Sequence, residues 1–187
     1  MALIVASVAG ATIGLASLVE ALRGEATPPA PVSAGPVLDI PFDDATSFAS
    51  TPFILDEGYV IDLVAGWELV GHTPERAVDR YRFERKSDAG ATILTISVYD
   101  VTRTPDFDAV VQARYGASML RKQESVMVGS LTAKRLTAEF LDMGATSDVL
   151  IKADVKNFVS IYGIRQPDAD ADMRVAKEIN FMQKSFR

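Results

Sequence analysis

The sequence contains no cysteine and only one histidine among its 187 residues. The absence of cysteine excludes a disulfide framework, a thiolate metal site and a lipid anchor attached to cysteine. It does not threaten stability, because a chain of this length can bury a core without covalent cross-links. A zinc site at the single histidine, His72, would need carboxylates alone to complete it. We therefore expect no metal and no cofactor, and we interpret His72 as an exposed loop residue.

Positive charge is also in deficit. The chain has 19 lysines and arginines against 25 aspartates and glutamates, which gives a formal net charge of −6. Proteins that bind nucleic acid draw much of their affinity from a basic surface, so we predict no nucleic-acid partner.

Signatures of catalysis are missing too. The sequence has no glycine-rich phosphate loop and no Gly-x-Ser-x-Gly motif. Nothing near His72 in the sequence indicates a catalytic triad. A hydrolase that uses His72 is therefore the weakest hypothesis, and we predict a protein without enzymatic activity.

What the sequence does have, first, is an apolar N-terminus. Residues 2–19 form an uncharged run of 18 residues, which as a helix would be about 27 Å long. We predict a transmembrane anchor helix within residues 1–23 that enters the lipid bilayer through residues 2–19. The alternatives are a targeting segment removed on export and a helix buried only in protein. Small residues at every fourth position would let a neighbouring helix pack closely: Ala2, Ala6, Gly10 and Gly14.

Residues 24–52 separate this segment from the rest of the chain. Their first half is rich in proline and glycine, which is typical of a semi-extended spacer. An irregular lead-in follows, and we interpret its acidic pair, Asp43 and Asp44, as a solvated loop.

Residues 53–187 carry the patterns of a folded domain. Alternating or β-branched stretches predict strands, and apolar stripes at helical spacing predict helices near 106–122 and 168–186. The order favours an α+β fold in which helices cover an antiparallel sheet. The predicted strands are residues 59–63, 78–83, 92–99, 126–128, 131–140, 148–155 and 158–162.

A basic cluster is the main candidate for partner docking. Its five residues lie within eleven positions of an acidic chain: Arg76, Arg80, Arg82, Arg85 and Lys86. Ion pairing with neighbouring acidic residues is one interpretation. The other is a surface that docks an acidic partner, since local charge complementarity steers association. Strand alternation places Arg80 and Arg82 on one face and Arg85 on the other.

The acidic run 168–172 superficially resembles a calcium-binding loop. Met173 stands where an EF-hand needs glycine, and Ile179 stands where it needs the closing glutamate, so that interpretation fails. Acidic residues are favoured in the first turn of a helix, which is the interpretation we adopt.

The order and spacing of several stretches resemble PsbP-like domains, over residues 53–187. The first stretch resembles the family's strand opening that ends in tryptophan, although Val64 stands where the family usually has proline. The stretches that carry the resemblance are Gly58–Trp67, Val78–Phe83, Ile93–Val98 with Thr104–Phe107, Asp154–Tyr162 and Met173–Phe186.

The resemblance implies an α-β-α sandwich without catalysis. In photosynthetic organisms such domains are extrinsic subunits or assembly factors of photosystems. The resemblance, together with the predicted anchor, leads us to expect a membrane-tethered subunit or assembly factor of a photosystem, on the lumenal side of the thylakoid membrane. The alternative is an anchored envelope protein of a bacterium that binds a small ligand or another protein.

Overall fold

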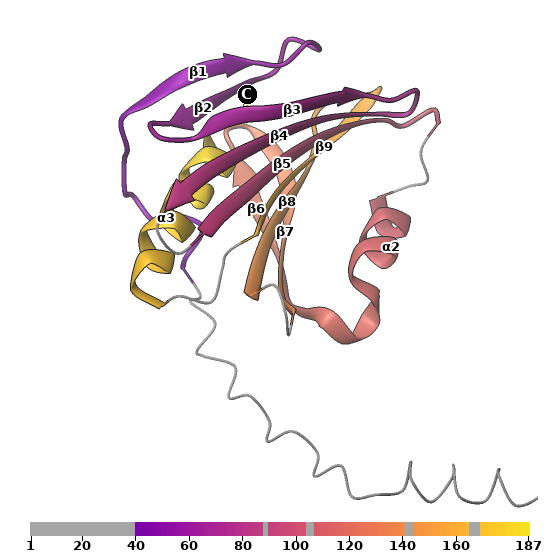
Figure 1. Ribbon diagram of the computed structural model, residues 1–187. Helices are drawn as coiled ribbons and strands as arrows, with labels where there is room; N and C mark the ends of the chain where they lie inside the picture. The colour runs from indigo at the N-terminus through magenta and orange to yellow at the C-terminus, as the bar shows by residue number, and fades with distance from the viewer. Residues whose placement is uncertain (1–39, 88–89, 104–106, 141–143, 165–168) are drawn as a thin grey trace, which may run out of the picture. The chain divides into compact units, whose positions relative to one another are not determined.

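The computed structural model describes residues 40–187 except 88–89, 104–106, 141–143 and 165–168. The predicted anchor with Ala2, Ala6, Gly10 and Gly14, and most of the predicted spacer, lie outside the described residues. Labels follow Figure 1, gaps included. The strands are β1 (Ser50–Ile54), β2 (Val60–Val64), β3 (Glu68–Pro74), β4 (Val78–Ser87), β5 (Gly90–Asp100), β6 (Leu120–Val128), β7 (Leu131–Phe140), β8 (Gly144–Lys152) and β9 (Asn157–Ile164). The helices are α2 (Phe107–Met119) and α3 (Ala169–Ser185).

The described strands form two antiparallel sheets. The larger has seven strands in the order β3-β4-β5-β9-β8-β7-β6, and β1 pairs with β2 in a separate two-stranded sheet. β6 and β7 are joined by a tight turn in which Gly129 has a φ of +56°. Glycine adopts that left-handed conformation without the strain a side chain would cause.

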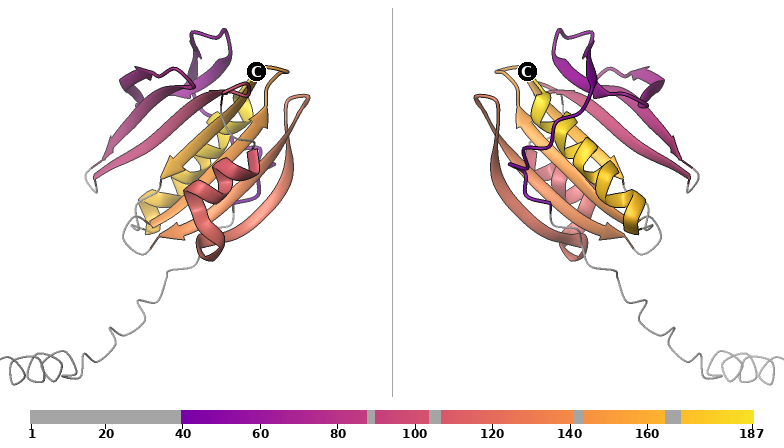
Figure 2. Two further views of the ribbon diagram at one scale, coloured as in Figure 1. Left: turned by 90° about the vertical axis from the view of Figure 1, so that its right-hand side faces the viewer. Right: turned by 90° about the vertical axis from the view of Figure 1, so that its left-hand side faces the viewer.

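The two helices lie on opposite faces of the large sheet (Figure 2). The face toward α3 carries the main core, because alternate residues of the central strands are apolar there. Phe83, Ile96 and Ile161 from the sheet are fully buried with Ile179 and Met182 from α3. On the opposite face, Tyr115 of α2 packs in a smaller buried cluster with three residues of the sheet, Leu136, Ala138 and Leu150.

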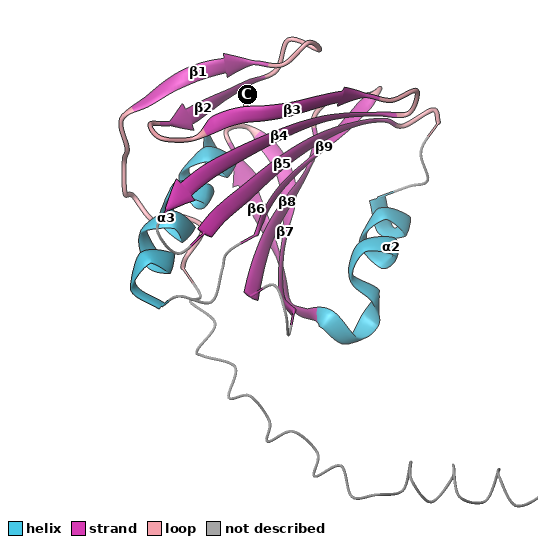
Figure 3. Cartoon of the chain, in the orientation of Figure 1, coloured by secondary structure: helices cyan, strands magenta, loops and turns pink. Residues whose placement is uncertain are grey.

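The prediction of an α+β, α-β-α sandwich is wrong, whereas the transmembrane helix predicted to precede it lies outside the described residues. The described chain is mostly antiparallel sheet, with nine strands and only two helices (Figure 3). Hydrophobic periodicity underestimated the strand content because β1 and β3 are exposed along nearly their whole length. They therefore lack the apolar alternation that identifies a half-buried strand. Among the described residues, no helix is long and apolar enough to cross a membrane.

Candidate functional site

The predicted docking arginines separate between the two faces of β4. Arg80 and Arg82 lie on the face that α2 partly covers, and both side chains are about half exposed, at 43% and 53%. Each forms an exposed ion pair with an acidic neighbour. The Arg80–Glu75 pair has an Nη1–Oε1 distance of 2.5 Å, and the Arg82–Glu84 pair has an Nη2–Oε1 distance of 2.9 Å. The ion pairing that the sequence allowed as an alternative is therefore present.

These two arginines border a stretch of sheet that the described helices leave bare. Arg82 is opposite Thr95 across the strand pair, and Ile93 is opposite Ile164 on the neighbouring strand. Thr95, Ile93 and Ile164 are each partly exposed. Figure 2 shows α2 in front of part of the sheet, with β3 and β4 to one side of it, and among the described residues Val110 of α2 packs on β4 only at its first residue, Val78. We call this surface the open face and define it as Arg80, Arg82, Ile93, Thr95 and Ile164.

Arg85 instead binds a buried side chain of the same protein. It forms an ion pair with Glu178 of α3, whose side chain is fully buried. The same carboxylate accepts a hydrogen bond from Trp67 Nε1 at 3.0 Å, and Arg174 contacts its other oxygen at 3.1 Å. A buried carboxylate needs such partners, because an uncompensated charge in the interior is strongly destabilising. Arg85 therefore fixes α3 on the sheet and is not available to a partner.

Arg76 and Lys86, the remaining members of the predicted cluster, are exposed at opposite ends of β4. The carbonyl of Arg76 accepts a hydrogen bond from Arg103 Nη1 at 3.1 Å, which ties the β3–β4 turn to the segment after β5. Of the five predicted docking residues, the structure places Arg80, Arg82 and Lys86 on one face of β4, since the register against β5 is unbroken, and Arg85 on the other face.

A buried polar network joins α2 to the sheet. Arg114 pairs with the buried Asp148 and donates to Tyr99 Oη at 3.0 Å, and Ser160 Oγ donates to Asp148 Oδ1 at 2.8 Å. Burial, and then the charge of Asp148, raise the pKa of Tyr115, so its hydroxyl remains a neutral donor to Asp148 at 3.0 Å. A serine beside an aspartate without an adjacent histidine lacks the base of a triad. The network therefore supports packing of α2.

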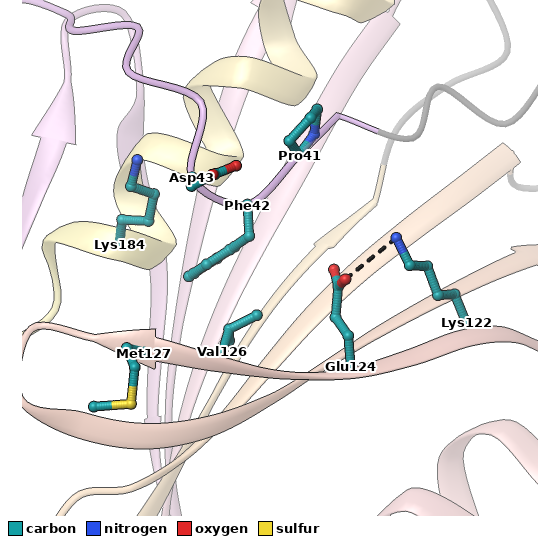
Figure 4. A pocket seen from close by; sticks show the side chains of 8 residues that line it. All are labelled: Pro41, Phe42, Asp43, Lys122, Glu124, Val126, Met127 and Lys184. Atoms are coloured by element: carbon teal, nitrogen blue, oxygen red, sulfur yellow. Dashed lines mark ion pairs between the residues drawn. The ribbon is translucent and has the colours of Figure 1, made fainter.

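A shallow groove of about 530 Å³ lies between β6, the end of α3 and the segment before β1 (Figure 4). Three of its four charged side chains already have a partner. Lys122 pairs with Glu124 at 3.2 Å, and Lys184 Nζ donates to the carbonyl of Asp44 at 2.6 Å. The groove is lined by Pro41, Phe42, Asp43, Lys122, Glu124, Val126, Met127 and Lys184.

His72 does not lie in a loop. It is on β3, opposite Tyr81, and its ring stacks on the Tyr81 ring at 4.3 Å with an interplanar angle of 10°. Its Nε2 lies 2.7 Å from Asp79 Oδ1 and 3.9 Å from Asp56 Oδ2. Sequence patterns did not reveal this cluster, because its members come from the turn after β1, from β3 and from β4. Only the strand register brings them together.

The acidic run 168–172 is only partly described, because α3 begins at Ala169 and Asp168 lies outside the described residues. No protein-family model matches the sequence, and a comparison with curated proteins finds no match. The resemblance to PsbP-like domains therefore stays a prediction, and function has to be inferred from geometry.

Proposed function

We propose that this protein is a non-catalytic binding subunit that docks an acidic surface of a partner protein on its open face. The observation that carries the proposal is the pair of exposed arginines, Arg80 and Arg82, beside a part of the sheet that α2 leaves bare. Arginine is enriched in protein interfaces and at their energetic centres.

The floor of the open face supports this role. Ile93, Thr95 and Ile164 offer partly exposed apolar and β-branched surface next to the guanidinium groups. Interfaces combine an apolar centre with polar groups at its rim. The open face has both components on one rigid sheet, so a partner would meet a surface that requires little ordering.

The existing ion pairs do not prevent docking. An exposed pair stabilises a protein by about 0–1 kcal/mol, because water screens both charges. Arg80 and Arg82 can therefore exchange Glu75 and Glu84 for carboxylates of a partner at small cost. Complementary charge would also accelerate the encounter, although the whole chain is acidic.

The absence of catalysis is part of the proposal. Among the described residues, the Ser160–Asp148 pair is the arrangement closest to a nucleophilic site, and both residues are fully buried. His72 lies on the other face of the sheet from the open face, on the side of Tyr81. The photosystem that the resemblance implies is one class of partner, and it stays a prediction.

Site-specific photo-crosslinking in the native host tests the proposal. A photoreactive benzoylphenylalanine at Thr95 should form an adduct with one partner protein. The adduct should disappear when Arg80→Glu and Arg82→Glu are combined, because the reversed charges repel an acidic surface. Identification of the adduct as a chlorophyll-binding subunit, or as another protein, decides between the photosystem and the envelope alternative.

Matched controls keep this test specific. Benzoylphenylalanine at Lys152, an exposed residue of β8, should not give the same adduct. The Lys152→Glu, Lys156→Glu variant changes net charge as much as the arginine reversal and should preserve the adduct at position 95. Adducts that survive the arginine reversal, or that form equally at position 152, would refute the proposal.

A further inference from the structure

We infer that Asp56, His72 and Asp79 form a binding site for one divalent transition-metal ion, of which Zn²⁺ is the best match. The inference is independent of the open face, because His72 lies on the Tyr81 side of the sheet. It replaces the expectation that the chain has no metal site, which rested on the need for carboxylates alone to complete a zinc site at His72.

The spacing of the ligand atoms fits an ion. His72 Nε2 lies 2.7 Å from Asp79 Oδ1 and 3.9 Å from Asp56 Oδ2, and one ligand atom from each residue lies within 4.8 Å of the others. Tetrahedral zinc with bonds of about 2.0–2.1 Å places its ligand atoms roughly 3.3 Å apart. The observed distances lie on both sides of that value. The Asp56 side chain is 74% exposed and can rotate toward the other two.

Tyr81 holds the three groups in place. Its ring is almost fully buried and carries the stacked His72 ring. Its hydroxyl oxygen accepts the backbone N–H of Asp56 at 2.9 Å and lies 3.2 Å from Asp79 Oδ2. A ligand orientation fixed by neighbouring groups is what distinguishes a metal site from carboxylates that are merely close.

Charge provides a separate argument. Asp56, Glu57 and Asp79 converge here, and within the described part of the chain none of them forms an ion pair with lysine or arginine. A bound dication would neutralise this excess of negative charge. One imidazole with carboxylates suits zinc or a similar transition metal better than calcium, which takes six to eight oxygen ligands.

Calorimetry on the chelator-treated full chain tests the inference, with ZnCl₂, MnCl₂ and CaCl₂ as probes. We expect one Zn²⁺ per chain, weaker Mn²⁺ binding and no saturable Ca²⁺ binding. Zn²⁺ binding should weaken as pH falls, because protons compete for the same ligands. Co²⁺ as a stand-in for Zn²⁺ should give a visible absorption band.

Two ligand variants separate binding from folding. His72→Phe retains a ring to stack on Tyr81 but removes the nitrogen ligand, and Asp79→Asn retains hydrogen bonding but removes the charge. Each should lower Zn²⁺ affinity about tenfold or more, while near-ultraviolet circular dichroism stays that of the wild type. Glu75→Gln, a nearby exposed carboxylate outside the cluster, should bind Zn²⁺ like the wild type.

Absence of Zn²⁺ binding, or equal binding by His72→Phe and the wild type, would overturn the inference. The arginine reversal should leave Zn²⁺ binding intact, and His72→Phe should leave the adduct at position 95 intact. Failure of one proposal is therefore distinguishable from failure of the other.

Discussion

Gly163 shows how closely a strand and a helix approach in this protein. It lies on β9 beneath Ile179 of α3, and a Cβ atom at this position would lie 2.7 Å from Ile179 Cγ2 and 2.9 Å from Cδ1. Ile179 is almost fully buried and cannot move aside freely. Glycine is needed here because a side chain would not fit. Its φ lies outside the left-handed region, so conformational freedom is not the reason.

Gly163→Ala should therefore destabilise the protein by about 1–3 kcal/mol, the usual cost of overpacking a core. Urea unfolding measures the change in the free energy of unfolding. Gly71→Ala is the matched control, since its Cβ would meet only Arg82 Cβ at 3.9 Å, and it should be nearly neutral. In the double variant with Ile179→Ala the two costs should be less than additive, because the clash has been removed. Equal costs at Gly163 and Gly71 would contradict this explanation.

At the scale of elements, the segment before β1 is a strap held by its main chain. Arg135 Nη1 donates to the carbonyl of Ile40 at 2.9 Å, and Asn180 Nδ2 lies 3.2 Å and 3.3 Å from the carbonyls of Pro41 and Phe42. The sequence predicted a solvated lead-in here, because side-chain polarity does not reveal main-chain hydrogen bonds. Within the described residues, Arg135 Nε and Asn180 Oδ1 are buried without a hydrogen-bond partner. The polar groups beneath the strap therefore already lack some of their hydrogen bonds.

A chain that begins at Ser47 should consequently be less stable than one that begins at Ile40. It loses the buried Ile40 side chain and leaves Asn180 Nδ2 without its two carbonyl acceptors, each loss costing on the order of 1–3 kcal/mol. Arg135 loses the carbonyl of Ile40 and keeps its ion pair with Glu124. Thermal unfolding of the two chains measures the difference. A third chain that starts at Ile40 and carries Asp43→Ala should match the longer one, since Asp43 is exposed. Coincident midpoints for all three chains would mean that the strap contributes nothing.

Which elements the sequence could predict depended on burial. The stretch 92–99 was predicted as a strand and lies within β5, whose Leu94 and Ile96 are fully buried and stand out by alternation. β3 was missed because it is an exposed edge strand. The cluster at His72 was missed for a different reason, since its residues meet only through the pairing of His72 with Tyr81. Because β3 was not predicted as a strand, its register against β4 could not be set.

At the scale of the whole domain, the last residues of the chain tie the small sheet to the core. The backbone of Arg187 exchanges two hydrogen bonds with Val60 of β2, at 2.8 Å and 3.0 Å. Phe186 is buried and its ring lies 5.3 Å from that of Tyr59. A two-stranded sheet is marginally stable by itself, so β1 and β2 depend on this attachment and on the core beneath them.

Phe186→Ala should therefore loosen β1 and β2 before it unfolds the large sheet. Loss of the buried ring costs about 3–5 kcal/mol overall, and the small sheet has the fewest alternative contacts to compensate. Hydrogen exchange followed by mass spectrometry should show faster exchange in residues 50–64 than in β5 or β9, because regions of low local stability open first. Arg187→Ala is the control. It removes the exposed ion pair with Asp62 at 2.9 Å but keeps both backbone bonds to Val60, so exchange in residues 50–64 should change little. Uniform acceleration across all strands in Phe186→Ala would instead show that the two sheets open as one cooperative unit.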